Sequence, residues 1–110
     1  MNLRVKESRV INEFKKKIEE TFLDELVGLT LFGSRARGEA TKESDMDLLV
    51  VIRSDDWRLG DRIREVGYAL ELKHGIILSI QVLSQRHIEQ LKGIRSQFLE
   101  EIEREGIVVV

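Results

Sequence analysis

The sequence predicts one small α/β domain in which helices and strands alternate along the chain. Short runs of apolar, often β-branched residues are typical of buried strands. They alternate with longer stretches in which apolar side chains recur every three or four residues, as in amphipathic helices. The 110 residues suffice for one domain with a single core. With 42% hydrophobic and 35% charged residues, the composition is that of a soluble globular protein.

The first half of the chain is predicted to begin with an amphipathic helix from about Val5 to Leu23. Its apolar side chains step by four residues: Val10, Phe14, Ile18 and Phe22. The first strand is predicted at Leu26 to Phe32, and a short helix or turn follows Ser34. After a loop through Glu39 to Ser44, the second strand is predicted at Met46 to Ile52.

The second half continues the alternation. The run from Ser54 to Asp56 favours a helix start, because acids in the first turn complement the helix dipole. This second long helix is predicted to end near Gly75, and a third strand follows at Ile76 to Leu83. A third long helix is predicted from Ser84, its cap, to Gly106. Residues 107–110 are expected to add a final strand.

Composition excludes several classes of protein. The net charge of −2 provides no overall basic field to attract nucleic acid. The absence of cysteine excludes disulfides and thiolate metal sites. The run from Met1 to Glu7 has no apolar core of a secretory signal, and no apolar run approaches the ~20 residues of a membrane span. We therefore expect a cytoplasmic protein that neither crosses a membrane nor binds nucleic acid.

Two acids precede the second predicted strand. Asp45 and Asp47 point the same way if this segment is extended, because side chains alternate between the faces of a strand. Neighbouring carboxylates repel, and one tends to hold its proton unless a cation lies between them. Mg²⁺ prefers oxygen ligands and is usually held by one or two carboxylates and substrate phosphates. The pair is a candidate site for Mg²⁺ or Mn²⁺; the alternative is a solvated strand start.

A Gly-Ser turn follows the first predicted strand. Gly33 allows tight backbone geometry and the close approach of a ligand. Ser34 is placed to cap a short helix whose free N–H groups would bind an anion. Arg35 and Arg37 lie close enough in sequence to neutralise phosphate. The alternative is an ordinary strand–turn–helix with exposed arginines.

The combined motif is more specific than its parts. FGSRARGEA, from Phe32 to Ala40, and SDMDLLV, from Ser44 to Val50, together resemble the signature of the minimal nucleotidyltransferases, a family with the DNA polymerase β-like fold. The resemblance implies a small mixed β-sheet of α+β type with helices packed on one face. Alternation alone would suggest parallel crossovers.

The resemblance also implies an activity and its residues. Gly33 and Ser34 would contact the triphosphate, and Asp45 and Asp47 would be the catalytic, metal-binding acids. The expected reaction is magnesium-dependent transfer of a nucleoside monophosphate, most simply AMP from ATP, to an acceptor hydroxyl on a protein or small molecule. Arg35 and Arg37 would steady the phosphates.

One position departs from the family pattern. Active members usually carry a third carboxylate on a later strand, and the matching position here is Gln81, with Ser79 as the other choice on the same face. Glutamine offers a neutral oxygen and no charge, whereas two-metal chemistry needs negative charge to hold both ions. Glu71 would supply the acid only by leaving its helix register. Two functions therefore stay open: an enzyme, and a catalytically reduced module that acts by pairing with another protein.

We also expect this chain to work with a protein partner. Larger transferases of this kind hold the acceptor in a second domain, for which this chain leaves no residues. Small members that it resembles are often found beside a small helical partner protein, including antitoxin-like pairs. Self-association through an exposed helix or the apolar edge at residues 108–110 is the alternative, since an unpaired strand edge invites strand addition.

Overall fold

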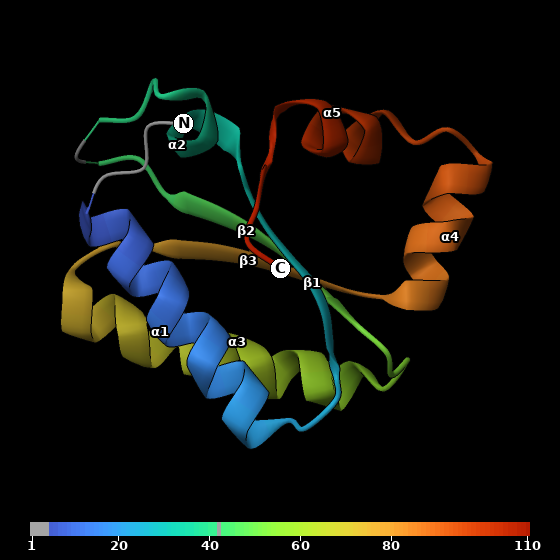
Figure 1. Cartoon of the computed structure of the whole chain (residues 1–110), viewed down its shortest axis with the longest axis horizontal. Coiled ribbons are helices and arrows are strands. Elements are labelled where there is room, and N and C mark those ends of the chain that lie inside the picture. Colours follow the sequence, from blue (N-terminus) through green and yellow to red (C-terminus); the bar gives the residue numbers. More distant parts are fainter. Residues whose placement is uncertain (1–4, 42) are drawn as a thin grey trace.

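The computed structural model describes residues 5–41 and 43–110, which form a mixed four-stranded sheet between helices (Figure 1). The elements in chain order are α1 (Val5–Thr21), β1 (Leu26–Phe32), α2 (Gly33–Arg37), β2 (Met46–Ile52), α3 (Trp57–His74), β3 (Leu78–Ser84), α4 (Gln85–Gly93), α5 (Gln97–Glu105) and β4 (Ile107–Val108). The predicted strands β1 and β2 have the predicted bounds. No helix among the described residues is long and apolar enough to cross a bilayer.

The sheet has the strand order β3-β2-β1-β4. β1 is antiparallel to both β2 and β4, whereas β2 and β3 are parallel and joined by the crossover helix α3. The mixed sheet confirms what the motif resemblance implied and rules out the all-parallel sheet suggested by alternation alone. Because β2 is central, residues on it are held by a strand on either side.

The main core lies between the sheet and the two long helices. Alternate residues of β2 point to this layer and are buried: Met46, Leu48, Val50 and Ile52. They meet the apolar stripe of α1 (Val10, Ile11, Phe14 and Ile18) and the stripe of α3 (Ile63 and Leu70). Each Å² of apolar surface that is buried stabilises the fold by about 25 cal/mol. The packing of β2 against both helices therefore holds this strand rigidly. The residues between them, Asp47 and Leu49, therefore face the opposite side of the sheet.

The opposite face is partly covered as well, which corrects the expectation of helices on one face only. Leu49 packs there against Leu99 and Ile102 of α5, and Phe32, Val51, Leu83, Ile88 and Leu91 surround this second cluster. Figure 1 shows α1 and α3 on one side of the sheet and α4 and α5 on the other. α4 and α5 therefore lie on the face of the sheet that carries Asp47.

The third long helix predicted from Ser84 to Gly106 is two helices instead. α4 ends at Gly93, Arg95 adopts the left-handed region with φ 53°, and Ser96 caps α5 by accepting a hydrogen bond from the N–H of Leu99 at 3.4 Å. The sequence signal was a glycine followed three residues later by a serine, a helix end and a helix start. The break turns the chain so that α5 returns over the sheet.

Other boundaries differ by a few residues. α1 ends at Thr21, two residues early, and β3 begins at Leu78 rather than at Ile76. The predicted cap of α4 is confirmed, since Ser84 accepts a hydrogen bond from the N–H of the third helical residue. α3 begins at Trp57, so the acids predicted in its first turn precede the helix instead, and Asp56 caps it through the N–H of the second helical residue. The final strand contains only Ile107 and Val108.

An ion-paired acid between α1 and α3 gives the fold a pH dependence. Lys73 donates a hydrogen bond to Glu13 at 2.9 Å, and His74 lies 3.3 Å from the other carboxylate oxygen. These partners, Lys73 first, hold the pKa of Glu13 below its ordinary value of 4.5. A lowered pKa stabilises the fold above the unfolded-state value, and that contribution is lost as the pH falls through the folded-state value.

We expect Glu13→Gln to lower stability at pH 7 and to have progressively less effect below about pH 4.5, as the wild-type carboxylate takes up its proton. Chemical denaturation of both proteins across this range measures the difference. Glu19→Gln, at an exposed position of α1, is the control and should have little effect at any pH. A Glu13→Gln difference that stays constant down to pH 3 would contradict the assignment.

Candidate active site

The two predicted acids lie together at the start of β2. Asp45 is exposed directly before the strand, and Asp47 is the second strand residue and half-buried. Burial, and then the negative charge of Asp45, raise the pKa of Asp47, while a hydrogen bond from Ser79 and the charge of Arg37 lower it. The structure therefore brings Asp45, Ser79 and Arg37 within electrostatic reach of Asp47.

Strand pairing explains why the glycine turn lies beside these acids. Phe32 is the register partner of Asp47 across the antiparallel β1–β2 pair. Gly33, the next residue, therefore lies at the same end of these two strands as the acids. Gly33 has φ 74°, and a Cβ atom there would collide with the Asp47 carboxylate and lie 3.1 Å from its Cγ. Glycine is therefore required at this position for two reasons: the backbone conformation and the close approach of the acid.

This close approach gives a test with a matched control. Gly33→Ala should destabilise the protein by about 1–2 kcal/mol through its left-handed backbone and displace Asp47, lowering any activity that depends on this acid roughly a hundredfold. Gly38 has nearly the same φ, 75°, but open space around it. Gly38→Ala should therefore show the stability loss without the activity loss. Equal activity of the two variants would show that Asp47 need not lie against the turn.

Ser34 occupies a different helical position from the one predicted. The capping residue of α2 is Phe32, and Ser34 lies inside the first turn after Gly33. The Phe32 side chain has no acceptor with which to engage the first-turn amides. The first N–H groups of a helix have no partner within the helix, and Ser34 does not cap those of α2. Gly33, the first residue of this helix, lies beside Asp47.

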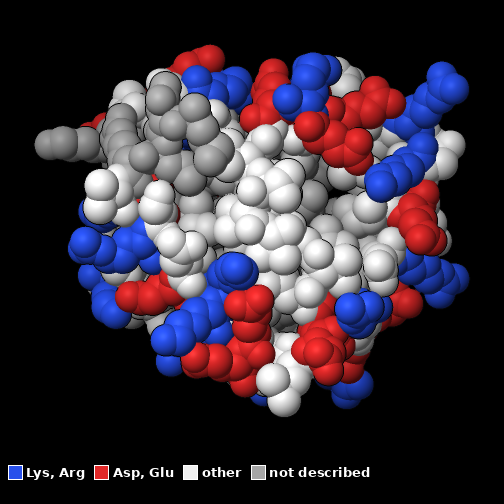
Figure 2. Space-filling model, in the orientation of Figure 1, with Lys and Arg blue, Asp and Glu red and all other residues white. Residues whose placement is uncertain are grey.

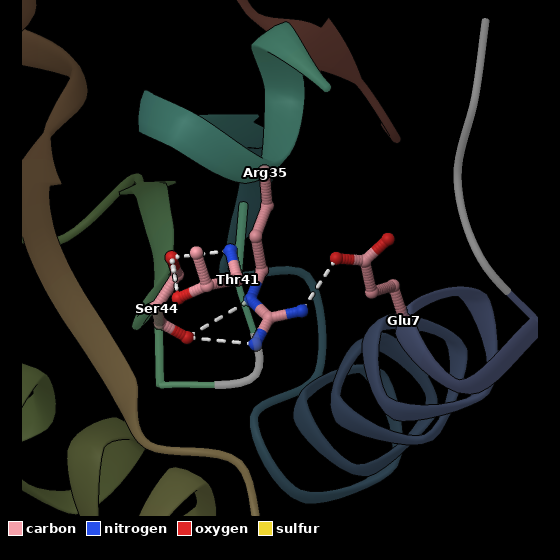
Figure 3. A network of polar contacts seen from close by, with 4 residues as sticks. All are labelled: Glu7, Arg35, Thr41 and Ser44. Atoms are coloured by element: carbon pink, nitrogen blue, oxygen red, sulfur yellow. Dashed lines mark hydrogen bonds and ion pairs between the residues drawn. The ribbon is translucent and has the colours of Figure 1, made fainter. Parts of the chain in front are cut away.

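Arg35 does not have the exposed position that a phosphate contact needs. Its guanidinium is buried, donates to Glu7 Oε2 at 2.7 Å, and holds the backbone carbonyl of Ser44 through Nη2 at 2.7 Å and Nε at 3.1 Å (Figure 3). Thr41 donates its N–H to Ser44 Oγ at 2.9 Å and so tightens the same loop. The observed role is to tie α1 and α2 to the residue directly before Asp45, which corrects the prediction of a phosphate ligand.

Arg37 remains at the surface of the site. It lies 3.4 Å from Glu39 and 3.5 Å from Glu105, and both contacts are exposed. Exposed pairs of this kind contribute about 0–1 kcal/mol and exchange readily for a stronger partner such as phosphate. Glu105 comes from α5, and nothing in the local sequence around the motif indicated that this helix would return to it.

The position of the missing third acid is defined by the register of β2 and β3. Ser79 lies directly across from Asp47, and Gln81, which is exposed, lies across from Leu49, one pair further from the acids on the same face. Glu71 does not compensate, because its carboxylate accepts the Leu78 N–H at 2.7 Å. Residues 5–41 and 43–110 contain no group of three or more histidines, cysteines or acids positioned around a metal.

A cavity lies at each end of the antiparallel β1–β2 pair. One of about 470 Å³ is at the far end of β2 and β3, between the starts of α3 and α4, and its charges pair among themselves, including Asp61 with Arg64 at 3.0 Å and Asp55 with Arg86 at 3.9 Å. A second, of about 230 Å³, adjoins Gly33 and Arg37. Of these two, the second lies beside the predicted site.

The comparison with known families agrees with this geometry. A family model described as a nucleotidyltransferase domain matches residues 11–108, which include every element of the sheet and the whole motif region. The protein therefore belongs to the nucleotidyltransferase family, as the resemblance of its motifs implied.

Two similar proteins from Methanocaldococcus jannaschii are each named "putative protein adenylyltransferase". One is 32% identical over 101 residues, covering 91% of this chain and 95% of the relative. The other is 34% identical over 90 residues, covering 79% of this chain and 60% of the relative.

Solved structures show the same fold. A Sulfolobus solfataricus protein titled a "putative nucleotidyltransferase" superposes with a TM-score of 0.57 at 21% identity, covering 91% of this chain and 76% of the other. A toxin–antitoxin structure with AMP-PNP gives a TM-score of 0.60 at 17% identity, covering 90% and 71%. At these identities the likeness establishes the fold alone.

Proposed function

We propose that this protein transfers AMP from ATP to an acceptor hydroxyl, with protein as the acceptor class. The observation that carries the proposal is the carboxylate of Asp47, which lies against the backbone of Gly33 where a side chain would collide with it, with the negative charge of Asp45 acting on the same carboxylate. The relatives named as protein adenylyltransferases support the choice of adenosine nucleotide and of a protein acceptor.

The donor set fits a hard divalent cation such as Mg²⁺ or Mn²⁺. Burial and the neighbouring Asp45 raise the pKa of Asp47, so the folded protein holds carboxylates that a cation would relieve of their repulsion. Asp45 and Asp47 would hold the ion together with phosphate oxygens. A bound ion would supply charge neutralisation and polarisation of the phosphoryl group.

The chain's own groups have distinct tasks in this reaction. The backbone at Gly33 and Ser34 would bind the triphosphate, and Arg37 would leave its exposed carboxylate partners to contact phosphate oxygens. The acceptor oxygen forms a bond to the α-phosphorus as the bond to pyrophosphate breaks, and the acceptor proton leaves to solvent. Catalysis then rests on positioning and on electrostatic stabilisation.

The position of the label tests the reaction. The protein is incubated with Mg²⁺, a heat-inactivated protein extract and ATP labelled at either the α- or the γ-phosphate. We expect label on protein from α-labelled ATP only, with pyrophosphate released in equal amount. Transfer of γ-label would identify a kinase-like reaction instead and would overturn the proposal.

A second function is favoured by one observation, the neutral residues that lie where a third acid is expected. Ser79 and Gln81 leave the described site with two carboxylates. A module that binds nucleotide and pairs with another protein would need no more. Ser79→Asp and Gln81→Asp separate the two functions. A rise in transfer of roughly tenfold or more, about 1.4 kcal/mol in the barrier, would favour the reduced module, and little change would favour the enzyme.

We further propose that the protein works with a protein partner, either a small helical protein or a second copy of itself. The toxin–antitoxin neighbour supports pairing, and several large apolar side chains are exposed, among them Leu72, Ile94 and Val108. Light scattering of the purified chain decides between the two: a dimer mass favours self-association, and a monomer favours a different partner.

A further inference from the structure

The cavity of about 230 Å³ beside the glycine turn lies between the acid-bearing face of the sheet and α5. Its walls are Phe32, Gly33 and Arg37 on one side, and Phe98, Glu101 and Glu105 of α5 on the other. Whole drug-sized ligands occupy about 300–1,000 Å³, so this space accommodates part of a nucleotide. Its position next to Gly33 connects it to the proposed triphosphate site.

We propose that this cavity holds the base of the nucleoside triphosphate, stacked against Phe98, and that α5 selects bases carrying an exocyclic amino group. This inference rests on the proposed function and deepens it. It assigns a specificity role to a helix that the nucleotidyltransferase motif does not include.

Phe98 has the properties of a stacking platform. It is 42% exposed although it is a large apolar residue. Its ring lies edge-to-face with Phe32, with centroids 6.0 Å apart and an interplanar angle of 85°. Edge-to-face packing holds the ring without covering both of its faces. Because Phe32 pairs with Asp47 in the sheet, the exposed ring is fixed relative to the catalytic acids.

The charges around Phe98 favour one orientation of the nucleotide. Acidic side chains gather over α5 (Figure 2), and Glu101 and Glu105 both reach the cavity. Carboxylates only accept hydrogen bonds, so they repel phosphates and favour amino groups. The phosphates would therefore lie toward Gly33 and Arg37, with the base toward α5.

Glu101 is the better candidate for the amino group. Glu105 lies 3.5 Å from Arg37 and therefore on the phosphate side of the cavity. Glu101 lies one helical turn earlier and accepts a hydrogen bond from the Gln97 amide at 3.3 Å on its own helix. A carboxylate has further acceptor sites after such a bond. Adenine, cytosine and guanine carry an exocyclic amino group and uracil does not, so we expect tighter binding of ATP than of UTP.

Calorimetric titration with three probes tests the inference: ATP, UTP and inorganic tripolyphosphate, each with Mg²⁺. Stacking on an aromatic residue contributes enough that its loss is measurable by substitution. Phe98→Leu keeps apolar volume but removes the ring face, and should weaken ATP binding about tenfold while leaving tripolyphosphate binding unchanged. Phe98→Tyr should retain ATP binding. Glu101→Gln should reduce the preference for ATP over UTP.

The outcomes separate this inference from the proposed function. Equal affinity of the wild type for ATP and tripolyphosphate, or unchanged ATP binding by Phe98→Leu, would overturn the base site while the triphosphate site stands. Parallel losses for ATP and tripolyphosphate in Phe98→Leu would overturn it too, because Phe98 would then only support the fold. Failure of the wild type to bind any of the three probes would overturn the proposed function and the base site together.

Discussion

Replacing Asp47 by asparagine is expected to abolish AMP transfer while leaving the protein folded. The carboxylate is one of two that would hold the divalent cation, and its loss removes several kcal/mol of transition-state stabilisation, a rate loss of roughly a thousandfold or more. Burial and the neighbouring Asp45 raise the pKa of Asp47, so its charge disfavours the fold at neutral pH. The thermal midpoint of Asp47→Asn without metal should therefore equal or exceed that of the wild type.

The matched control is Asp55→Asn, at the other end of β2 in the cavity whose charges pair among themselves. It should leave the rate of pyrophosphate release unchanged. Rates are measured under saturating ATP and Mg²⁺, with circular dichroism to verify folding. Residual transfer by Asp47→Asn within about tenfold of wild type would mean that this acid does not hold the metal.

Replacing Arg35 by methionine is expected to give the largest loss of stability of any substitution in the motif. Glu7 and Arg35 form a buried ion pair at 2.7 Å with side-chain exposures of 3% and 4%. Removing one member of such a pair leaves the other charge buried and costs about 3–5 kcal/mol, a large share of a typical stability of about 5–15 kcal/mol. Guanidinium denaturation measures the change.

Two further variants make the result specific. Arg37→Met removes an exposed arginine from the same short helix and should cost about 1 kcal/mol or less. Glu7→Leu combined with Arg35→Met removes both buried charges and should recover much of the lost stability. If Arg35→Met retained wild-type stability and lost only ATP binding, the phosphate role predicted from sequence would be correct after all.

The contrast between Arg35 and Arg37 shows where sequence reasoning reached its limit. Both follow the glycine turn, and local sequence gives each the same opportunity to meet phosphate. The distinguishing signal lay far away, in the register of the first helix: Glu7 precedes Val10 by three residues and Phe14 by seven, on the buried stripe of α1. An acid on an apolar helix face requires a buried cationic partner.

The strands that carry the site were easier to predict than the helices that cover it. β1 and β2 are apolar runs bounded by Gly33 and by the acids, so their limits could be predicted from the local sequence. The return of α5 over the sheet depends on the left-handed turn at Arg95 and on packing of Leu99 against Leu49, which are tertiary events. Without that return, the proximity of Glu105 and Phe98 to the motif could not be foreseen.

The most direct test of the nucleotide site is calorimetric titration of ATP into the wild-type protein with Mg²⁺ and with EDTA, alongside Asp47→Asn. The Asp45–Asp47 pair beside Gly33 predicts saturable binding that requires both the divalent cation and Asp47. Binding that persists undiminished in EDTA and in Asp47→Asn, or no binding at millimolar ATP, would contradict the site as described.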